Sequence, residues 1–566
     1  MVRPQNPGES QAGRRPTVDL SRQTLADAPA PAGLLLSYAL HPTLISEFQL
    51  SKSSSKKFKS TTYRSDLITL TDGVVAEGDA DGVFSVANRG GNDTFLGAAN
   101  QINIAYGETD GAMSGGARGG DDKFLGGDDA LNLFVGDAAS LSGKGTRGGN
   151  DTFHGGDAND GYGLALNVAV GDATGYGASL SPVEPEPTVL EPFVPELSAE
   201  TIGSIIDFAA SLFDPAGGVR DGARGGDDKL YGGDVGVDGY AALNLLIGDA
   251  DFIGATESVG PASVSSEDCD KSDDAQGGND KLYGGSVLED GYAINLMAGD
   301  ALVIDAGGRG GDDKLVGGNG NLDGYGGVAP TDEPAPEPTG PSIAINLLLG
   351  DALLMNGVAG DDKVEGGNGA FNLLLGDGYA AIGPDATDGD DVLYSGENSL
   401  FLMLGDTLDG YGLDLGSMDL GTLAQVASES QLDGEGGEDR FVIESESIGA
   451  IVDFSLADGD KIDLSRLLDH DDDEDGDDDH DDDHDDDDCD DDHDDESEEL
   501  SAEMIALLET IIVNDAEVPE TFGGLTGTII DFSLADASYG MGSGVVAVVG
   551  VTAEELEANL WQVFIV

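Results

Sequence analysis

The chain has 566 residues and a formal net charge of −86, because 111 aspartates and glutamates stand against 25 lysines and arginines. So acidic a balance makes nucleic acid a poor partner, and it opposes compact packing without counterions. The 88 glycines indicate turns, the two isolated cysteines give no disulfide framework, and no run of 18 apolar residues predicts a membrane span.

Residues 1–63 form a basic leader that differs from the rest of the chain. Eight lysines and arginines stand there against four acids. The early apolar stretch, residues 32–40, is short and follows a long polar lead, so it is not typical of a secretory signal. Two interpretations stay open, a flexible leader and a basic arm that docks on the acidic part of the chain.

Residues 64–430 carry an internal repeat. Residues 118–127 read Arg-Gly-Gly-Asp-Asp-Lys-Phe-Leu-Gly-Gly. Further copies occupy residues 89–98, 147–156, 224–233, 276–285, 309–318, 358–367 and 387–396. Where no insertion intervenes, the repeated aromatic recurs every 29 residues, as at Phe95, Phe124 and Phe153. A fixed period of this length predicts stacked structural units.

Each unit is interpreted as one coil of an all-β, parallel β-solenoid, a β-roll or β-helix. Within a unit, nine-residue steps bounded by glycine suit a short strand followed by a tight turn. Three short strands per coil are expected, and a two-stranded roll with a long loop is the alternative. One coil cannot bury its apolar face alone, so eight coils about 4.8 Å apart should stack into a rod on the order of 40 Å long.

The second acid of each copy is predicted to point into the solenoid. Asp122 precedes Phe124 by two positions, and a period of two places both on one side of a strand. The predicted column contains Asp93, Asp122, Asp151, Asp228, Asp280, Asp313, Asp362 and Asp391. Carboxylates about 5 Å apart repel by roughly 3 kcal/mol per pair at an effective dielectric of about 20. A cation between them relieves this repulsion, and hard oxygen ligands favour several Ca²⁺ ions. Exposed acidic turns that need no ion are the alternative.

A second element, apolar-Asn-apolar followed by Gly-Asp, comes after each copy, and its second apolar residue lies nine residues after that of the copy in units such as Phe124 to Leu133. Its aspartates form a second candidate calcium column, with solvated turn acids as the open alternative. They are Asp137, Asp172, Asp249, Asp300, Asp351, Asp377 and Asp406. The asparagines are predicted to form a hydrogen-bonded ladder, with a surface ladder that binds a lattice or glycan as the alternative. The residue before each asparagine, such as Leu243, is expected to point inward and fill this corner with hydrocarbon.

Insertions interrupt the coils at residues 174–222, 251–275 and 323–342, and residues 202–213 of the first suit a short amphipathic helix. In solenoids such insertions form loops on the flank. Residues 431–566 return to alternating strands and are predicted to form a small β-rich C-terminal domain. An Asp/His-rich insertion at 469–498 interrupts it, where histidines and Cys489 could hold zinc. A disordered acidic tract that binds cations loosely is the other interpretation.

The copy at residues 148–156, Gly-Gly-Asn-Asp-Thr-Phe-His-Gly-Gly, resembles the RTX, or hemolysin-type, calcium-binding repeat. The resemblance implies a right-handed parallel β-roll in which the first aspartate column and turn carbonyls bind Ca²⁺. Residues 434–566 resemble the C-terminal domain of type I secretion substrates, through Asp453-Phe454, residues 458–464 and the final Phe564-Ile565-Val566. This likeness implies export by a type I apparatus to the exterior or cell surface of a Gram-negative-type bacterium.

The sequence therefore predicts a secreted, non-catalytic calcium-binding protein that folds on Ca²⁺ outside the cell. A matrix, surface or adhesive role is expected, with cell-surface or matrix glycans as candidate partners. The rival is an extracellular hydrolase or toxin that uses the repeats as an export and folding module. Against it, the chain contains neither His-Glu-x-x-His nor Gly-x-Ser-x-Gly, and the leader is too short for a catalytic domain.

Overall fold

The computed structural model describes about three fifths of the chain. The described residues are 65–71, 74–79, 84–85, 88–159, 163–174, 217–237, 239–255, 274–322, 342–381, 383, 386–407, 436–468, 500–513, 527–535, 539 and 541–566. The basic leader, most of the three insertions and the Asp/His-rich insertion lie outside them.

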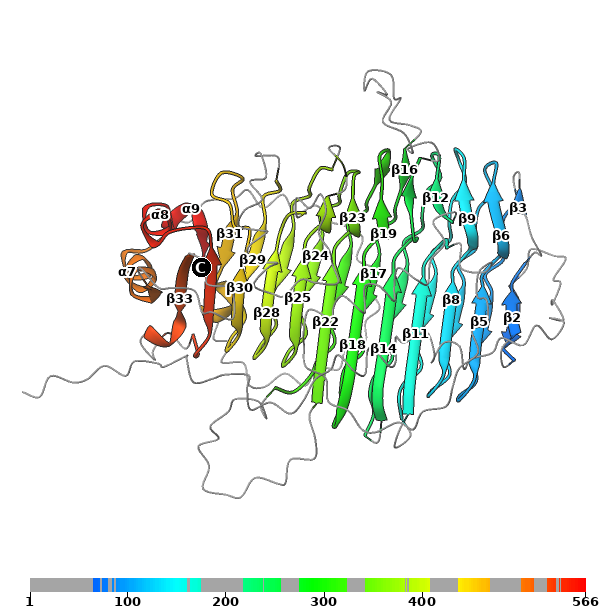
Figure 1. The fold of residues 1–566 in the computed structure, drawn as a ribbon, viewed down its shortest axis with the longest axis horizontal. Coiled ribbons are helices and arrows are strands. Elements are labelled where there is room, and N and C mark those ends of the chain that lie inside the picture. Colours follow the sequence, from blue (N-terminus) through cyan, green and yellow to red (C-terminus); the bar gives the residue numbers. More distant parts are fainter. Residues whose placement is uncertain are drawn as a thin grey trace, which may run out of the picture.

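Most of the described strands form a parallel β-solenoid and follow one another in chain order along the long axis, and two antiparallel strands, Gly527–Asp531 and Ile512–Val513, are added at the C-terminal end (Figure 1). One complete coil contains β7 (Lys123–Leu125), β8 (Leu131–Val135) and β9 (Ala138–Ser142), each in a different sheet. Equivalent residues stack directly, so that Phe95 pairs with Phe124 and Phe124 with Phe153. The predicted all-β solenoid with three strands per coil is confirmed.

Three long sheets, here named A, B and C, run the length of the stack. Sheet A contains β1 (Leu67–Thr69), β4 (Thr94–Leu96), β7, β10 (Thr152–His154), β13 (Lys229–Tyr231), β17 (Lys281–Tyr283), β21 (Lys314–Val316), β24 (Lys363–Glu365), β27 (Val392–Tyr394), β29 (Arg440–Val442), β31 (Lys461–Asp463) and β35 (Phe564–Ile565). Sheet B contains β2 (Val74–Glu77), β5 (Ile102–Tyr106), β8, β11 (Gly163–Val170), β14 (Gly239–Ile247), β18 (Gly291–Ala298), β22 (Ser342–Leu349), β25 (Phe371–Leu375), β28 (Leu400–Leu404), β30 (Ile448–Ile451), β34 (Val545–Val549), β33 (Gly527–Asp531) and β32 (Ile512–Val513). Sheet C contains β3 (Phe84–Ser85), β6 (Thr109–Ser114), β9, β12 (Gly218–Arg220), β15 (Ile253–Gly254), β19 (Ala301–Ile304), β23 (Ala352–Met355) and β26 (Gly378–Ala381), and β16 (Ala275–Gln276) pairs with β20 (Gly308–Arg309).

The C-terminal part continues the stack. Sheets A and B both cross the predicted boundary at residue 430. Phe441 of sheet A pairs with Leu393 and with Ile462, and Ile448 of sheet B pairs with Leu400. The 12 strands of sheet A make the rod on the order of 50 Å long, more than the eight repeat copies predicted, since β1, β29, β31 and β35 lack the full motif.

Short helices close the C-terminal end of the rod (Figure 1). They are α6 (Ser465–Leu468), α7 (Ala502–Ile511), α8 (Ala553–Ala558) and α9 (Leu560–Val563), with a 3₁₀ turn at Phe532–Leu534. Leu508, Leu556 and Val563 bury their side chains in the core between sheets A and B. In the described part of the chain, no helix has the length and apolar character needed to cross a membrane.

The interior is divided into layers. Between sheets A and B, Phe124 stacks on Phe153 with ring centroids 5.3 Å apart, and Phe134 of sheet B packs against both rings. A second apolar layer, which includes Leu141 and Ala117, lies next to sheet C. The repeated polar residues occupy the spaces that these layers leave.

The residue before each repeated asparagine does not point inward, which corrects the expectation for Leu243. Along β14, Asn244 and Leu246 face the interior, so Leu243 and Leu245 lie on the opposite face of sheet B. There they join a separate apolar cluster that runs from coil to coil. The predicted hydrocarbon corner is wrong, because the corner is filled by the asparagines and by a row of alanines such as Ala165 and Ala242.

Candidate metal centre

The first aspartate column lies inside the solenoid as predicted. Each aspartate immediately precedes a strand of sheet A, whose central apolar residue packs in the core. The eight predicted side chains are between 0% and 3% exposed: Asp93, Asp122, Asp151, Asp228, Asp280, Asp313, Asp362 and Asp391. Eight carboxyl groups removed from water need partners, because an unpaired buried charge is costly.

One oxygen of each carboxylate in this column has a partner. The backbone N–H of Asp122 donates to Asp151 Oδ1 at 2.6 Å, and the N–H of Asp228 donates to Asp280 Oδ1 at 2.5 Å. The same bond links every neighbouring pair of coils, from Asp66 to Asp93 and onward. Each aspartate therefore fixes the position of the coil before it.

The other oxygen has no donor. Among the described residues, no hydrogen-bond partner reaches Oδ2 of Asp93, Asp122, Asp151, Asp228, Asp280, Asp313, Asp362, Asp391 or Asp439. A buried carboxylate oxygen without a donor is rare in a folded protein and calls for an unseen proton or cation. Its regular recurrence, once per coil, indicates a property of the repeat.

The second column is buried too, which excludes solvated turn acids. Its members follow the strands of sheet B and are between 0% and 2% exposed: Asp137, Asp172, Asp249, Asp300, Asp351, Asp377 and Asp406. Each accepts a hydrogen bond from a glycine N–H of the next repeat copy, such as Gly149 to Asp137 Oδ2 at 2.9 Å. Oδ1 of Asp137, Asp172 and Asp249 has no partner among the described residues.

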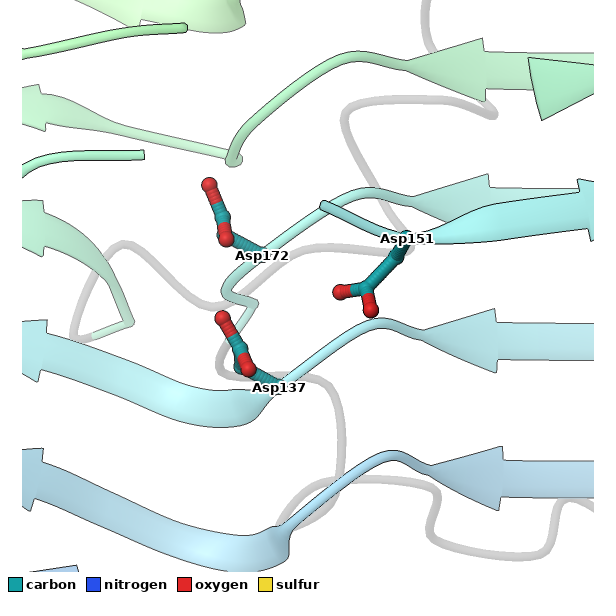
Figure 2. Close-up of side chains that lie close together, drawn as sticks. All are labelled: Asp137, Asp151 and Asp172. Carbon is teal, nitrogen blue, oxygen red and sulfur yellow. The ribbon is translucent and has the colours of Figure 1, made fainter. Parts of the chain in front are cut away.

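The two columns converge on one central space. Asp137 and Asp172 come from neighbouring turns after sheet B, and Asp151 faces them from the turn before sheet A (Figure 2). One oxygen from each of the three lies within 4.8 Å of the others. Two further triads satisfy the same limit, Asp172 with Asp228 and Asp249, and Asp377 with Asp388 and Asp406. The sequence predicted two separate columns, whereas the structure brings them together.

Glycines make this convergence possible. A Cβ on Gly136 would lie 2.0 Å from Asp151 Oδ2 and 1.6 Å from the carbonyl oxygen of Gly171. A Cβ on Gly148 would lie 1.5 Å from Asp172 Oδ1. The missing side chains leave room for the carboxylates, and carbonyl oxygens line the same space. The conserved spacing of Gly-Gly-x-Asp within this chain's copies is thus explained by packing around the acids.

Burial raises the pKa of these carboxyls far above that of a free aspartate. The pKa of Asp151 is well above the usual value, first because the group is desolvated and then because Asp137 and Asp228 repel its charge. Desolvation likewise raises the pKa of Asp249 to about 6 and that of Asp351 to about 8. With no cation, the columns would therefore hold many protons near neutral pH.

The donor set fits a hard divalent cation. It consists of carboxylate and carbonyl oxygens, with no histidine or cysteine in any of the three triads. Ca²⁺ accepts six to eight such oxygens in flexible geometry, whereas Mg²⁺ demands a near-ideal octahedron and Zn²⁺ prefers nitrogen and sulfur. The buried aspartate clusters could thus hold metal ions.

Several members of the columns were missed in the sequence. Asp79 and Glu108 occupy second-column positions, and Asp439 continues the first column, each with one buried oxygen that lacks a partner among the described residues. The signals were present, since Gly78-Asp79, Gly107-Glu108 and Gly436-Gly437-Glu438-Asp439 follow the repeat. Asp388, half-buried in the third triad, carries no such signal because its position in the other copies holds glycine or alanine.

The asparagine ladder forms as predicted. Asn132 Nδ2 donates to Asn167 Oδ1 at 2.9 Å and to the carbonyl of Gly127 at 3.0 Å, while its Oδ1 accepts from the Gly127 N–H. The same pattern continues through the further members, Asn103, Asn167, Asn244, Asn295, Asn346 and Asn372. Burial of these amides excludes a surface role for the ladder. The zinc alternative for the Asp/His-rich insertion concerns residues outside those described.

Comparison of the chain with protein-family models, with curated proteins and with solved structures found no match.

Proposed function

We propose that this protein is a secreted, non-catalytic calcium-binding solenoid of RTX type that folds when Ca²⁺ enters its two convergent carboxylate columns. The observation that carries the proposal is the buried Oδ2 atom that lacks a donor in coil after coil, from Asp93 to Asp439. A proton on each column acid would neutralise its charge, but no ion would then lie between the three carboxylates of each triad. A divalent cation supplies both the charge and the missing partner.

Calcium levels then decide where the chain folds. Extracellular calcium modules bind at about 10⁻⁴ to 10⁻³ M, far above the calcium concentration of a cytosol. Because metal binding contributes directly to the folding free energy, the chain would stay unfolded in the producing cell and fold outside. A rigid rod assembled this way suits a matrix, surface or adhesive role better than catalysis.

A calcium titration tests the folding proposal. In chelator, circular dichroism should show coil, and millimolar-scale Ca²⁺ should produce β-structure, with Mg²⁺ much less effective. Asp228→Ala with Asp280→Ala should move the midpoint to higher Ca²⁺, because two adjacent coils lose column ligands. The control, Asp227→Ala with Asp312→Ala, removes two exposed acids, one beside Asp228 and the other beside Asp313 in the coil after Asp280. Full β-content in chelator, unchanged by Ca²⁺, would overturn the proposal.

Export has its own test. The proposal assigns the address to the C-terminal segment, because the likeness to type I secretion substrates lies there. Removal of residues 551–566 should leave the protein inside the producing cell, while the purified truncation still responds to Ca²⁺. Normal appearance of the truncated protein in the medium would sink the export proposal and leave the calcium proposal standing.

A further inference from the structure

A cleft of about 300 Å³ opens on the outer face of sheet A, in the C-terminal half of the rod. The last residues of β21, β24 and β27 line it, namely Val316, Glu365 and Tyr394, which point away from the core. Residues of the turns that follow these strands also line the cleft, together with Glu444 and with Arg466 of α6. Ligand pockets have volumes of roughly 300–1,000 Å³, so the cleft has room for a small ligand.

Ion pairs hold the charged side chains of the cleft in place. Glu365 Oε1 lies 2.9 Å from Lys363 Nζ. Glu444, which is 9% exposed, has its Oε1 2.6 Å from Arg466 Nη1. Lys363 Nζ and Arg466 Cζ lie 4.9 Å and 4.7 Å from the centroid of the Tyr394 ring. Cations at such distances are attracted to an aromatic ring, so Tyr394 links the two ion pairs and the polar groups of the cleft are fixed by one another.

The ladder of turn residues beside the cleft changes from acids to amides. In earlier coils, Asp157 Oδ1 accepts the Asp234 N–H at 2.9 Å. At the cleft, Asn319 Oδ1 accepts the Asn368 N–H at 2.8 Å, and Asn368 Oδ1 accepts the Glu397 N–H at 2.8 Å. The backbone bond is the same for an acid and an amide, so the ladder itself does not require asparagine. Both asparagines are exposed, and neither Nδ2 donates to a described residue, which leaves two amide donors at the cleft.

The cleft is balanced in charge, in a chain whose net charge is −86. Its three acids are matched by three bases that pair with them or line the cleft: the acids Glu365, Glu397 and Glu444, and the bases Lys314, Lys363 and Arg466. An anionic polymer would be repelled by the chain as a whole, and a cationic one would meet the three bases, so an uncharged ligand fits best. Carboxylates only accept hydrogen bonds and an amide Nδ2 only donates them, and hydroxyl groups can serve both.

We propose that this cleft binds a neutral glycan. Sugar hydroxyls donate to the carboxylates of the cleft and accept from the Nδ2 groups of Asn319 and Asn368. The inference rests on the surface or adhesive role of the proposed function, and it gives that role a ligand class and a site. None of the three acid triads of the carboxylate columns includes a residue of the cleft, so the glycan and Ca²⁺ bind in separate places.

Exchange of the two amides for acids tests the site. Asn319→Asp with Asn368→Asp keeps the oxygens that accept backbone N–H groups, but it removes both donors and adds two negative charges. The full chain in millimolar-scale Ca²⁺ should retain neutral oligosaccharides on an array of neutral and acidic glycans. In calorimetry with the best of these, the variant should bind at least about tenfold more weakly. The matched control, Asp157→Asn with Asp234→Asn, makes the reverse change in the same ladder away from the cleft and should bind like the wild type.

Other results would overturn the inference. A chain that is folded in Ca²⁺ but retains no neutral glycan, or only acidic ones, would refute the cleft and leave the calcium proposal standing. Equal affinities of the wild type and the aspartate variant would place the bound glycan outside the cleft. Release of reducing ends from the glycan would mean hydrolysis in place of binding. Glycan binding by a chain that is fully folded in chelator would support the cleft and contradict the calcium proposal. Far-UV circular dichroism of every variant separates these outcomes from a failure to fold.

Discussion

The aspartate column and the asparagine ladder each place one buried polar side chain per coil inside the solenoid, and the two side chains have nearly the same shape. In both, one oxygen of the side chain accepts a backbone N–H, as at Asp151 and at Asn132. The amide then closes its own network, since Asn132 Nδ2 donates to the next asparagine and to a carbonyl. The carboxylate has no donor to offer, and Asp151 Oδ2 is left without a partner among the described residues.

The asparagine ladder therefore satisfies its own hydrogen bonds, whereas the aspartate column does not. An amide carries both donors and acceptors, so a stack of asparagines is complete without any ligand. An ionised carboxylate is an acceptor only, and adjacent ones about 4.8 Å apart repel by about 3 kcal/mol at an effective dielectric of about 20. The solenoid thus combines a polar seam that is complete by itself with one that needs a proton or a cation on each acid.

Exchanging the two side chains should change the stability of the fold more than any other substitution considered. Asn244→Asp removes the donor that reaches Asn295 Oδ1 and the Gly233 carbonyl, and it buries a charge where no second acid column converges. The free energy of unfolding in saturating Ca²⁺ should fall by about 2–4 kcal/mol. The reciprocal change, Asp228→Asn, should instead weaken calcium binding and relieve repulsion in chelator. Equal responses of the two variants to Ca²⁺ would contradict the distinction.

Acid should act on the carboxylate seam in opposite directions with and without calcium. In chelator, the raised pKa values of Asp249, about 6, and Asp351, about 8, exceed that of an unfolded aspartate. The fold therefore gains stability as pH falls from 8 to 5, and it loses that contribution as pH rises through 6 to 8. In Ca²⁺ protons compete with the metal, so the same acidification should lower stability. In chelator, where coil is expected near pH 8, circular dichroism should show more β-content near pH 5, whereas in Ca²⁺ thermal unfolding should show lower stability near pH 5. The same direction of change in the two conditions would contradict metal ligation.

The sequence was sufficient for each column taken alone. The two-residue offset between Asp122 and Phe124 predicts an inward acid, and the direct stacking of coils aligns these acids into a column. It was not sufficient for the convergence of Asp137, Asp151 and Asp172, because Asp137 and Asp172 follow strands of sheet B while Asp151 precedes a strand of sheet A, and only the folded coils bring these turns together. The direction of Leu243 was misjudged because strongly apolar residues occupy both faces of sheet B, so hydrophobicity no longer marks the interior.

The smallest effect is expected at the one triad that includes a half-buried acid. Asp388 lies with Asp377 and Asp406, and its Oδ1 also accepts the Thr407 N–H at 3.2 Å. Asp388→Asn keeps an oxygen for that bond but removes one negative charge from a site that solvent partly screens. One calcium ion should bind more weakly, with a change in unfolding free energy within about 1 kcal/mol, while the β-content in Ca²⁺ stays unchanged. Isothermal titration calorimetry resolves this if the weakest class of sites loses affinity and the others do not. A loss of affinity at every site would mean that the columns fill as one cooperative unit. The triads would then act as one continuous row of ion sites along the rod, and not as separate sites.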